Sequence, residues 1–94
     1  MSEQETLERL IEVQNSQGIH ARPAAMIVKL ASQYQATLTV AREDEDDEIN
    51  AKSIMGIMML AAEPGSSLLF RAQGPDAAEL LDALEELFRS KFNE

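Results

Sequence analysis

The sequence predicts one α+β domain in which helices cover one face of an antiparallel or mixed β-sheet. Segments with the alternating hydrophobicity of strands are interrupted by segments with a helical apolar stripe, in the order β-α-β-β-α-β-α. The 94 residues are enough for one modest core, and no internal repeat or linker divides them. We therefore expect residues 1–94 to form a single domain with a flexible N-terminus at residues 1–5.

The first strand, the first helix and the second strand are predicted from the periodicity of their apolar residues. The second half of residues 7–13 alternates between apolar and polar side chains, as in a strand with one solvated face, and residues 15–18 break it. A helix is expected from Ala21, with Pro23 in the first turn, where an amide would have no partner within the helix. Residues 36–42 return to β-type alternation with β-branched side chains. The stripe of the helix consists of Ile27, Leu30, Ala31 and Tyr34.

Six consecutive acidic residues, 43–48, separate this second strand from a short third strand at residues 49–51. We expect the acidic run to be a solvated turn. It lacks the glycine and the ligand spacing of a calcium site, so no metal site is predicted there. The second helix is expected to begin with Ser53 as its N-cap and to continue through about residue 60 or 61.

The last strand and the last helix have the clearest patterns. In residues 68–73, Leu68, Phe70 and Ala72 alternate with Leu69, Arg71 and Gln73. Asp76 then precedes a helix with the cap-x-x-Glu spacing, so we expect its side chain to cap that helix. The apolar stripe of the helix continues to the C-terminus through Leu80, Leu81, Leu84, Leu87, Phe88 and either Lys91 or Phe92.

The composition excludes several functional classes. With a formal net charge of −9, the chain is repelled by phosphate backbones and anionic membranes, so we expect neither nucleic acid nor a membrane as a partner. The absence of cysteine and the single histidine exclude disulfides, thiolate metal sites and a multi-histidine zinc site. The N-terminus lacks the pattern of a signal peptide, and the longest apolar stretch is nine residues. We expect a cytoplasmic monomer without a metal.

His20 is the one side chain that is both nucleophilic and titratable near neutral pH. It lies in the sequence GIHARPAA, residues 18–25, directly before the first helix. The unpaired amides and the positive dipole end of a helix start stabilise an anion, and Arg22 can offer its guanidinium to phosphate oxygens. These parts fit a phosphoryl group on His20. Spacing alone also allows a surface histidine or a simple helix cap.

Residues 18–25 closely resemble the active-site signature of HPr, the family of histidine-containing phosphocarriers of the bacterial phosphoenolpyruvate:sugar phosphotransferase system. Residues 50–58, NAKSIMGIM, are similar to the regulatory serine motif of that family. The resemblance covers nearly the whole chain and implies an open-faced β-sandwich, with a four-stranded antiparallel sheet covered on one face by three helices. It also implies that His20 accepts phosphate on Nδ1 from enzyme I and passes it to enzyme IIA domains, while Arg22 stabilises the phosphate.

A carrier of this kind is not an enzyme with turnover of its own. The resemblance implies that it needs no cofactor, because phosphoenolpyruvate is the ultimate phosphoryl donor and acts through enzyme I. For Ser53 it implies phosphorylation by HPr kinase/phosphorylase, a regulatory role that is compatible with an N-cap. The kinase and a transcription regulator are therefore further expected partners.

The second helix has more apolar surface than one core stripe requires. Ile57 and Leu60 share one side, whereas Met55, Met58 and Met59 point to the other, with Ile54 at the margin. We expect Ile54, Met55 and Met58 to be exposed and to bind partners, as this helix does in the HPr family. The alternative is a helix that is buried on all sides.

Two other functions stay open at this point. One is a non-catalytic regulatory adaptor that is controlled through Ser53, in which His20 has no role. The other is a carrier of the nitrogen-related branch of the phosphotransferase system, which residues 58–62 resemble. An intact His20-Ala21-Arg22-Pro23 favours a carrier over the adaptor, because an adaptor does not need a nucleophilic ring at a helix start.

Overall fold

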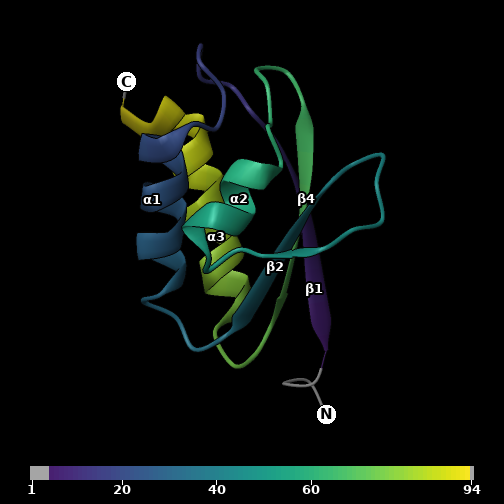
Figure 1. Ribbon diagram of the computed structural model, residues 1–94. Helices are drawn as coiled ribbons and strands as arrows, with labels where there is room; N and C mark the ends of the chain where they lie inside the picture. The colour runs from purple at the N-terminus through teal and green to yellow at the C-terminus, as the bar shows by residue number, and fades with distance from the viewer. Residues whose placement is uncertain (1–4, 94) are drawn as a thin grey trace.

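The computed structural model describes residues 5–93 and has an open-faced sandwich architecture. Its antiparallel sheet has four strands in the order β1-β4-β2-β3. Helices α1, α2 and α3 all lie on the same face of this sheet (Figure 1). The strands are β1 (Thr6–Glu12), β2 (Thr37–Arg42), β3 (Ile49–Asn50) and β4 (Ser67–Gln73), and the helices are α1 (Ala21–Ala31), α2 (Ile54–Met59) and α3 (Ala77–Arg89). The predicted fold class and element order are confirmed.

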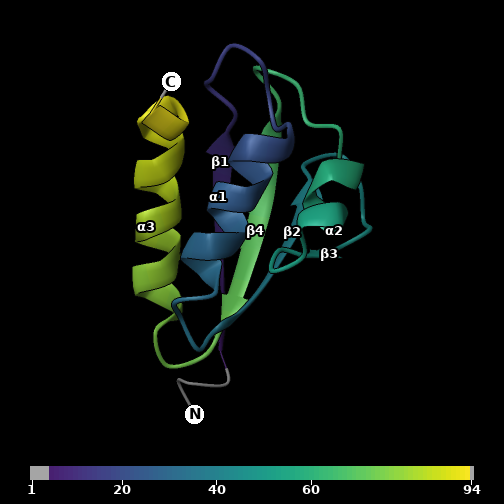
Figure 2. The ribbon, with the colours of Figure 1, turned by 60° about the vertical axis from the view of Figure 1, so that its left-hand side comes forward.

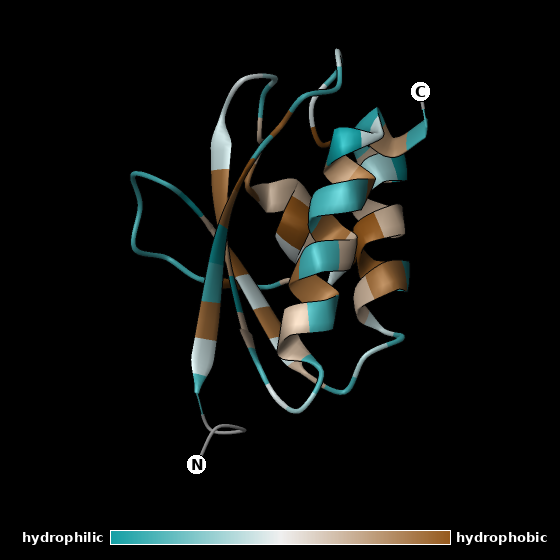
Figure 3. Cartoon of the chain, turned by 180° about the vertical axis from the view of Figure 1, so that it is seen from behind, coloured by the Kyte–Doolittle hydropathy of each residue, from teal (hydrophilic) through white to brown (hydrophobic). Residues whose placement is uncertain are grey.

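β4, one of the two inner strands, pairs with β1 on one side and with β2 on the other. Phe70 lies opposite Arg9 of β1 and Val40 of β2. The inward side chains Leu68, Phe70 and Ala72 are buried, as the alternation predicted. α1 and α3 cover the β1–β4 half of the sheet, and α2 lies beside β3 (Figure 2). Brown and teal segments alternate along α1 and α3 in Figure 3, as expected for helices with one face toward a core.

The predicted bounds differ from the observed ones by a few residues at most. The first strand is Thr6–Glu12 rather than 7–13, and α2 ends at Met59 rather than at residue 60 or 61. α1 ends at Ala31, so Tyr34 belongs to the following turn, although it still packs against the core. Helix ends fray, and local periodicity does not define them to the residue.

The prediction that Asp76 caps α3 through its side chain is wrong. Asp76 occupies the N-cap position, but its carboxylate makes no capping hydrogen bond. It accepts hydrogen bonds from the backbone amides of Gln35 and Ala36 instead, both at 2.9 Å. These two bonds hold the pKa of the Asp76 carboxyl below its usual value, and the bond from the Gln35 amide has the larger effect. Asp76 thus joins the start of α3 to the loop that precedes β2.

The C-terminal stripe is buried except at Leu87, which is half-buried, but one continuous helix does not form it. α3 ends at Arg89, and Lys91, Phe92 and Asn93 have φ values of 57°, 57° and 61°. This left-handed turn brings the Phe92 ring to 4.8 Å from that of Phe88, where Phe92 is fully buried. Phe88 in turn contacts Phe70 of β4 edge to face, at 5.7 Å.

The acidic run forms an exposed turn between β2 and β3, as predicted. One of its residues, Glu48, is tied back to the sheet, because it accepts a hydrogen bond from Thr39 at 2.7 Å and forms an ion pair with Arg71. No helix among residues 5–93 is long and apolar enough to cross a membrane. The prediction of a flexible segment at residues 1–5 falls outside the described residues, except for Glu5, which is exposed.

Candidate functional site

The loop between β1 and α1 is held by hydrogen bonds to the loop that precedes β4. Val13 donates its amide to the carbonyl of Ser66 at 2.8 Å, and Ile19 donates to the carbonyl of Ala62 at 3.0 Å. Within the loop, the buried side chain of Asn15 donates from Nδ2 to the carbonyl of Gly18 at 2.7 Å. These bonds fix the backbone directly before His20.

Gly18 is required at its position for two reasons. Its φ of +72° lies in the left-handed region, which disfavours residues with a Cβ atom. A Cβ placed there would also lie 2.5 Å from the carbonyl oxygen of Ala62. Gly18 therefore lets the two loops approach closely enough for the Ile19–Ala62 hydrogen bond to form.

His20 occupies the N-cap position of α1. Its carbonyl accepts the first bond of the helix, from the amide of Ala24 at 3.0 Å, whereas its imidazole makes no capping hydrogen bond. The side chain is half-buried, and its Nε2 atom is buried. The Nε2 atom is therefore shielded from a partner that approaches the ring.

The first turn of α1 provides groups that bind an anion. The amides of Ala21 and Arg22 lie where a helix supplies no carbonyl partner, and Pro23 has no amide to satisfy. The side chain of Arg22 is exposed and forms no ion pair among residues 5–93. The positive end of the helix dipole points toward the same region. Two amides, a dipole and a guanidinium therefore surround the start of the helix.

Ser53 is the N-cap of α2, as predicted. Its hydroxyl oxygen accepts a hydrogen bond from the amide of Gly56 at 3.1 Å. Gly56 in turn permits close packing of α2 on β3, because a Cβ there would lie 2.5 Å from Cγ2 of Ile49. Ser53 itself is half-buried, at the edge of the helix surface.

α2 has one buried side and one exposed side. Ile57 and Leu60 are 1% and 6% exposed, so they form the side that packs on the core. The alternative of a helix buried on all sides is therefore excluded. The opposite side, which we call the methionine face, consists of Ile54, Met55, Met58 and Met59, with exposed fractions of 42%, 73%, 41% and 76%.

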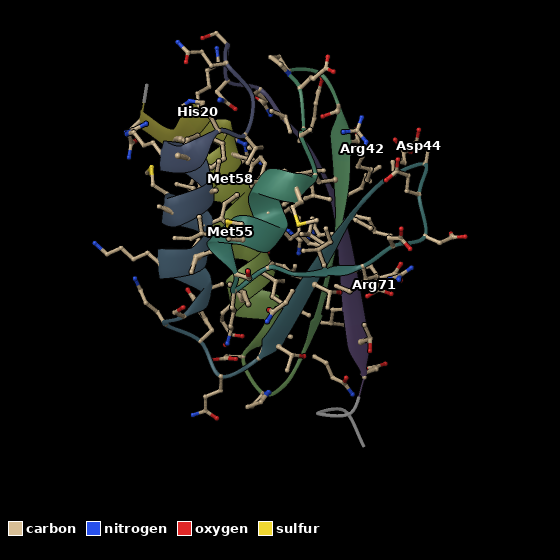
Figure 4. The ribbon with its side chains drawn as sticks, viewed as in Figure 1. His20, Arg42, Asp44, Met55, Met58 and Arg71 are labelled. Carbon is tan, nitrogen blue, oxygen red and sulfur yellow. The ribbon has the colours of Figure 1, made fainter. Side chains whose placement is uncertain are left out.

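The structure brings His20 and two residues of the methionine face, Met55 and Met58, to one side of the molecule. α2 packs against α1, and Figure 4 shows His20 at the start of α1 with Met58 and then Met55 below it. Asp44 of the acidic run and Arg42 lie on the opposite side of the same view, away from His20 (Figure 4). No group of three or more histidine, aspartate or glutamate side chains among residues 5–93 is placed to hold a metal ion.

Two residues that support the site were not predicted from the sequence. Arg42 donates from its guanidinium to the carbonyls of Leu60 and Ala61 at the end of α2, at 2.9 and 3.4 Å. No local pattern connects a residue of β2 with that helix. Asn15 is the other, and here a signal existed, since asparagine in a turn often bonds nearby backbone.

The open-faced sandwich thus places a histidine at a helix start, beside groups that can bind an anion and an exposed apolar helix. Residues 7–90 match the family described as the PTS HPr component phosphorylation site. The phosphocarrier protein HPr of Treponema pallidum is 44% identical over 86 residues, which are 92% of this chain and 96% of that protein.

Two further relatives agree with this match. The phosphocarrier protein NPr of Proteus mirabilis is 38% identical over 92% of this chain and 94% of its own. The crystal structure of HPr-C-His from Thermoanaerobacter tengcongensis superposes with a TM-score of 0.86 at 42% identity, covering 94% of this chain and 97% of that one. The chain belongs to the HPr family of phosphocarriers of the phosphotransferase system.

Proposed function

We propose that this chain accepts a phosphoryl group on Nδ1 of His20 from phospho-enzyme I and passes it to enzyme IIA domains. The observation that carries the proposal is the position of His20: its ring lies at the N-cap of α1 without capping the helix, and Nε2 is buried. The nucleophile is thus held in place, while the first-turn amides stay available for the group that it receives.

The transfer requires an exchange of one bond to phosphorus. The lone pair of Nδ1 attacks the phosphorus atom, and the bond between phosphorus and the donor breaks, so the donor leaves with the electron pair. The negatively charged phosphoryl oxygens then lie close to the amides of Ala21 and Arg22 and to the Arg22 guanidinium, which stabilise them. The same steps in reverse deliver the group to an acceptor. No cofactor takes part, and phosphoenolpyruvate reaches the carrier only through enzyme I.

The methionine face is the proposed docking surface for enzyme I and for enzyme IIA domains, with Ile54, Met55 and Met58 as its main contacts. It is apolar, exposed and on the same side of the molecule as His20. Flexible thioethers can adapt to several partners, as a relay protein requires. We also propose that the carrier is monomeric and cytoplasmic.

Ser53 is the proposed site of regulatory phosphorylation by HPr kinase/phosphorylase. Its hydroxyl already faces the Gly56 amide, so a phosphate there remains near the helix dipole. About two negative charges would then lie beside Ile54 and Met55, which weakens binding of an acidic partner and favours an arginine-bearing one, such as a transcription regulator.

One second candidate is a carrier of the nitrogen-related branch. Residues 58–62 resemble that branch, and the Proteus mirabilis relative bears the name NPr. The two candidates share the chemistry at His20 and differ in the partners, among them the enzyme I that supplies the phosphate. The chain can be labelled in parallel with the enzyme I of each branch, at equal concentrations. The enzyme that gives the faster phosphate uptake identifies the branch that this carrier serves.

The test is intact-mass spectrometry at neutral pH after incubation with enzyme I, magnesium and phosphoenolpyruvate. We expect one phosphoryl addition that disappears in mild acid, since phosphohistidine is acid-labile, and that passes to an added enzyme IIA domain. His20→Ala should remain folded, because the ring makes no capping bond, and should take up no phosphate. Ser53→Ala is the matched control and should be labelled normally. Labelling that persists in His20→Ala would contradict the proposed acceptor.

The regulatory part is tested separately with HPr kinase/phosphorylase and ATP. We expect one acid-stable addition, absent from Ser53→Ala, and slower labelling of His20 by enzyme I afterwards. If Ser53 is not phosphorylated, or if its phosphorylation leaves the His20 rate unchanged, the regulatory proposal fails and the carrier proposal stands.

A further inference from the structure

The methionine face concentrates oxidisable side chains on a single short helix. Met55 and Met59 are 73% and 76% exposed, and Met58 is 41% exposed. By contrast, the side chain of Met26 in α1 is less exposed than these three, because it is half-buried and packs against the core. Peroxide attacks a thioether at a rate that follows its accessibility, so among the methionines of residues 5–93 it reaches those of this face first.

We propose that Met55, Met58 and Met59 form a reversible oxidation site that switches off docking of this carrier to its partners. The reagent is hydrogen peroxide. The sulfur attacks one peroxide oxygen, the O–O bond breaks, an S=O bond forms and water leaves. The thioether loses two electrons and the peroxide gains them. The inference rests on the proposed docking role of α2.

The consequence follows from the position of the sulfur atoms. A sulfoxide is polar and accepts hydrogen bonds, so burying it against an apolar partner surface leaves its oxygen unsatisfied. The fold does not depend on these side chains, because the core side of α2 is formed by Ile57 and Leu60. Oxidation should therefore weaken partner binding and leave the folded protein with an intact His20. A methionine sulfoxide reductase with a thiol reductant would restore the thioethers.

The sequence allows the oxidation to be located by digestion. Trypsin releases Met55, Met58 and Met59 together in residues 53–71, whereas Met26 and His20 lie in residues 10–29 and Met1 in residues 1–9. Limited treatment with peroxide should add oxygen first to residues 53–71, at Met55 and Met59 before Met58. Preferential oxidation of residues 10–29 would contradict the proposal.

The functional test measures the rate of phosphate transfer from enzyme I at a subsaturating concentration of the carrier, before and after peroxide. For the unmodified sequence we expect a fall of about tenfold, the loss of one or two interfacial anchors. Met26→Leu should show the same fall. In the triple variant Met55→Leu, Met58→Leu, Met59→Leu, peroxide should leave the rate at its own starting value. Reductase treatment should reverse the fall in the unmodified chain.

The outcomes separate this inference from the proposed function. If the untreated chain takes no phosphate from enzyme I, the proposed function itself fails. If it is labelled, but the oxidised chain is labelled as fast, only the oxidation switch is overturned. An equal fall in the triple variant, or unfolding of the oxidised chain by circular dichroism, would also overturn it, because the damage would then lie elsewhere.

Discussion

Replacing Gly18 by alanine tests whether the contact between the two loops positions His20, and replacing Gly65 is its matched control. Both glycines have φ values in the left-handed region, +72° and +88°. They differ in their surroundings, since a Cβ at Gly65 would meet nothing within 4 Å, whereas one at Gly18 would lie 2.5 Å from the carbonyl oxygen of Ala62. The difference between the two variants therefore isolates the contact.

The magnitudes follow from these environments. A left-handed conformation costs an alanine about 1–2 kcal/mol, and this term applies to both variants. Gly18→Ala must in addition move the two loops apart and lose the hydrogen bond from Ile19 to Ala62, which contributes about 1 kcal/mol or more. We expect a loss of about 1–2 kcal/mol in the free energy of unfolding for Gly65→Ala and of about 2–4 kcal/mol for Gly18→Ala. A domain of ordinary stability remains folded in both cases.

Two assays are needed, because stability and site geometry are separate consequences. Urea unfolding gives the free energies, and a rapid-quench experiment gives the rate of phosphate uptake from enzyme I. Gly18→Ala should slow uptake about tenfold, since it displaces the backbone next to His20, while Gly65→Ala should keep the original rate. If the free energies of unfolding of the two variants agreed within about 0.5 kcal/mol and their uptake rates were the same, the loop contact would not position the histidine.

Three further predictions concern other parts of the structure. The hydrogen bonds that lower the pKa of Asp76 stabilise the fold above about pH 4, and this stabilisation is lost as the pH falls through the folded-state pKa. In Asp76→Asn, the urea concentration at half-unfolding should therefore be lower than in the unmodified chain at about pH 5, and it should change less between about pH 5 and pH 2. Arg42→Ala should cost about 1 kcal/mol of stability in urea unfolding, because the end of α2 loses a charged donor, and an unchanged midpoint would contradict this. Met55→Glu should weaken enzyme I binding by about 1–3 kcal/mol in titration calorimetry without changing the melting temperature, and unchanged affinity would show that Met55 is not a contact.

Features that depend on neighbours along the chain could be predicted before the structure was known. Strand alternation has a period of two and a helical stripe recurs every three to four residues, so the element order and the inward residues of β4 could be predicted without a structure. The N-cap role of Ser53 and the place of His20 at a helix start are local in the same sense, since each depends on the few residues that follow it.

Features that join distant residues became visible in the folded chain alone. The carboxylate of Asp76 had the spacing of a cap, but amides 40 and 41 residues away compete for it and hold it instead. Phe92 is buried through a left-handed turn, because the aromatic core beside Phe88 outweighs the preference for a continuing helix. The contact of Gly18 with Ala62 and the bond from Arg42 to the end of α2 likewise exist only once the sheet has brought those segments together. Local patterns carry no information about such partners, because the free energy that selects them comes from packing across the whole domain.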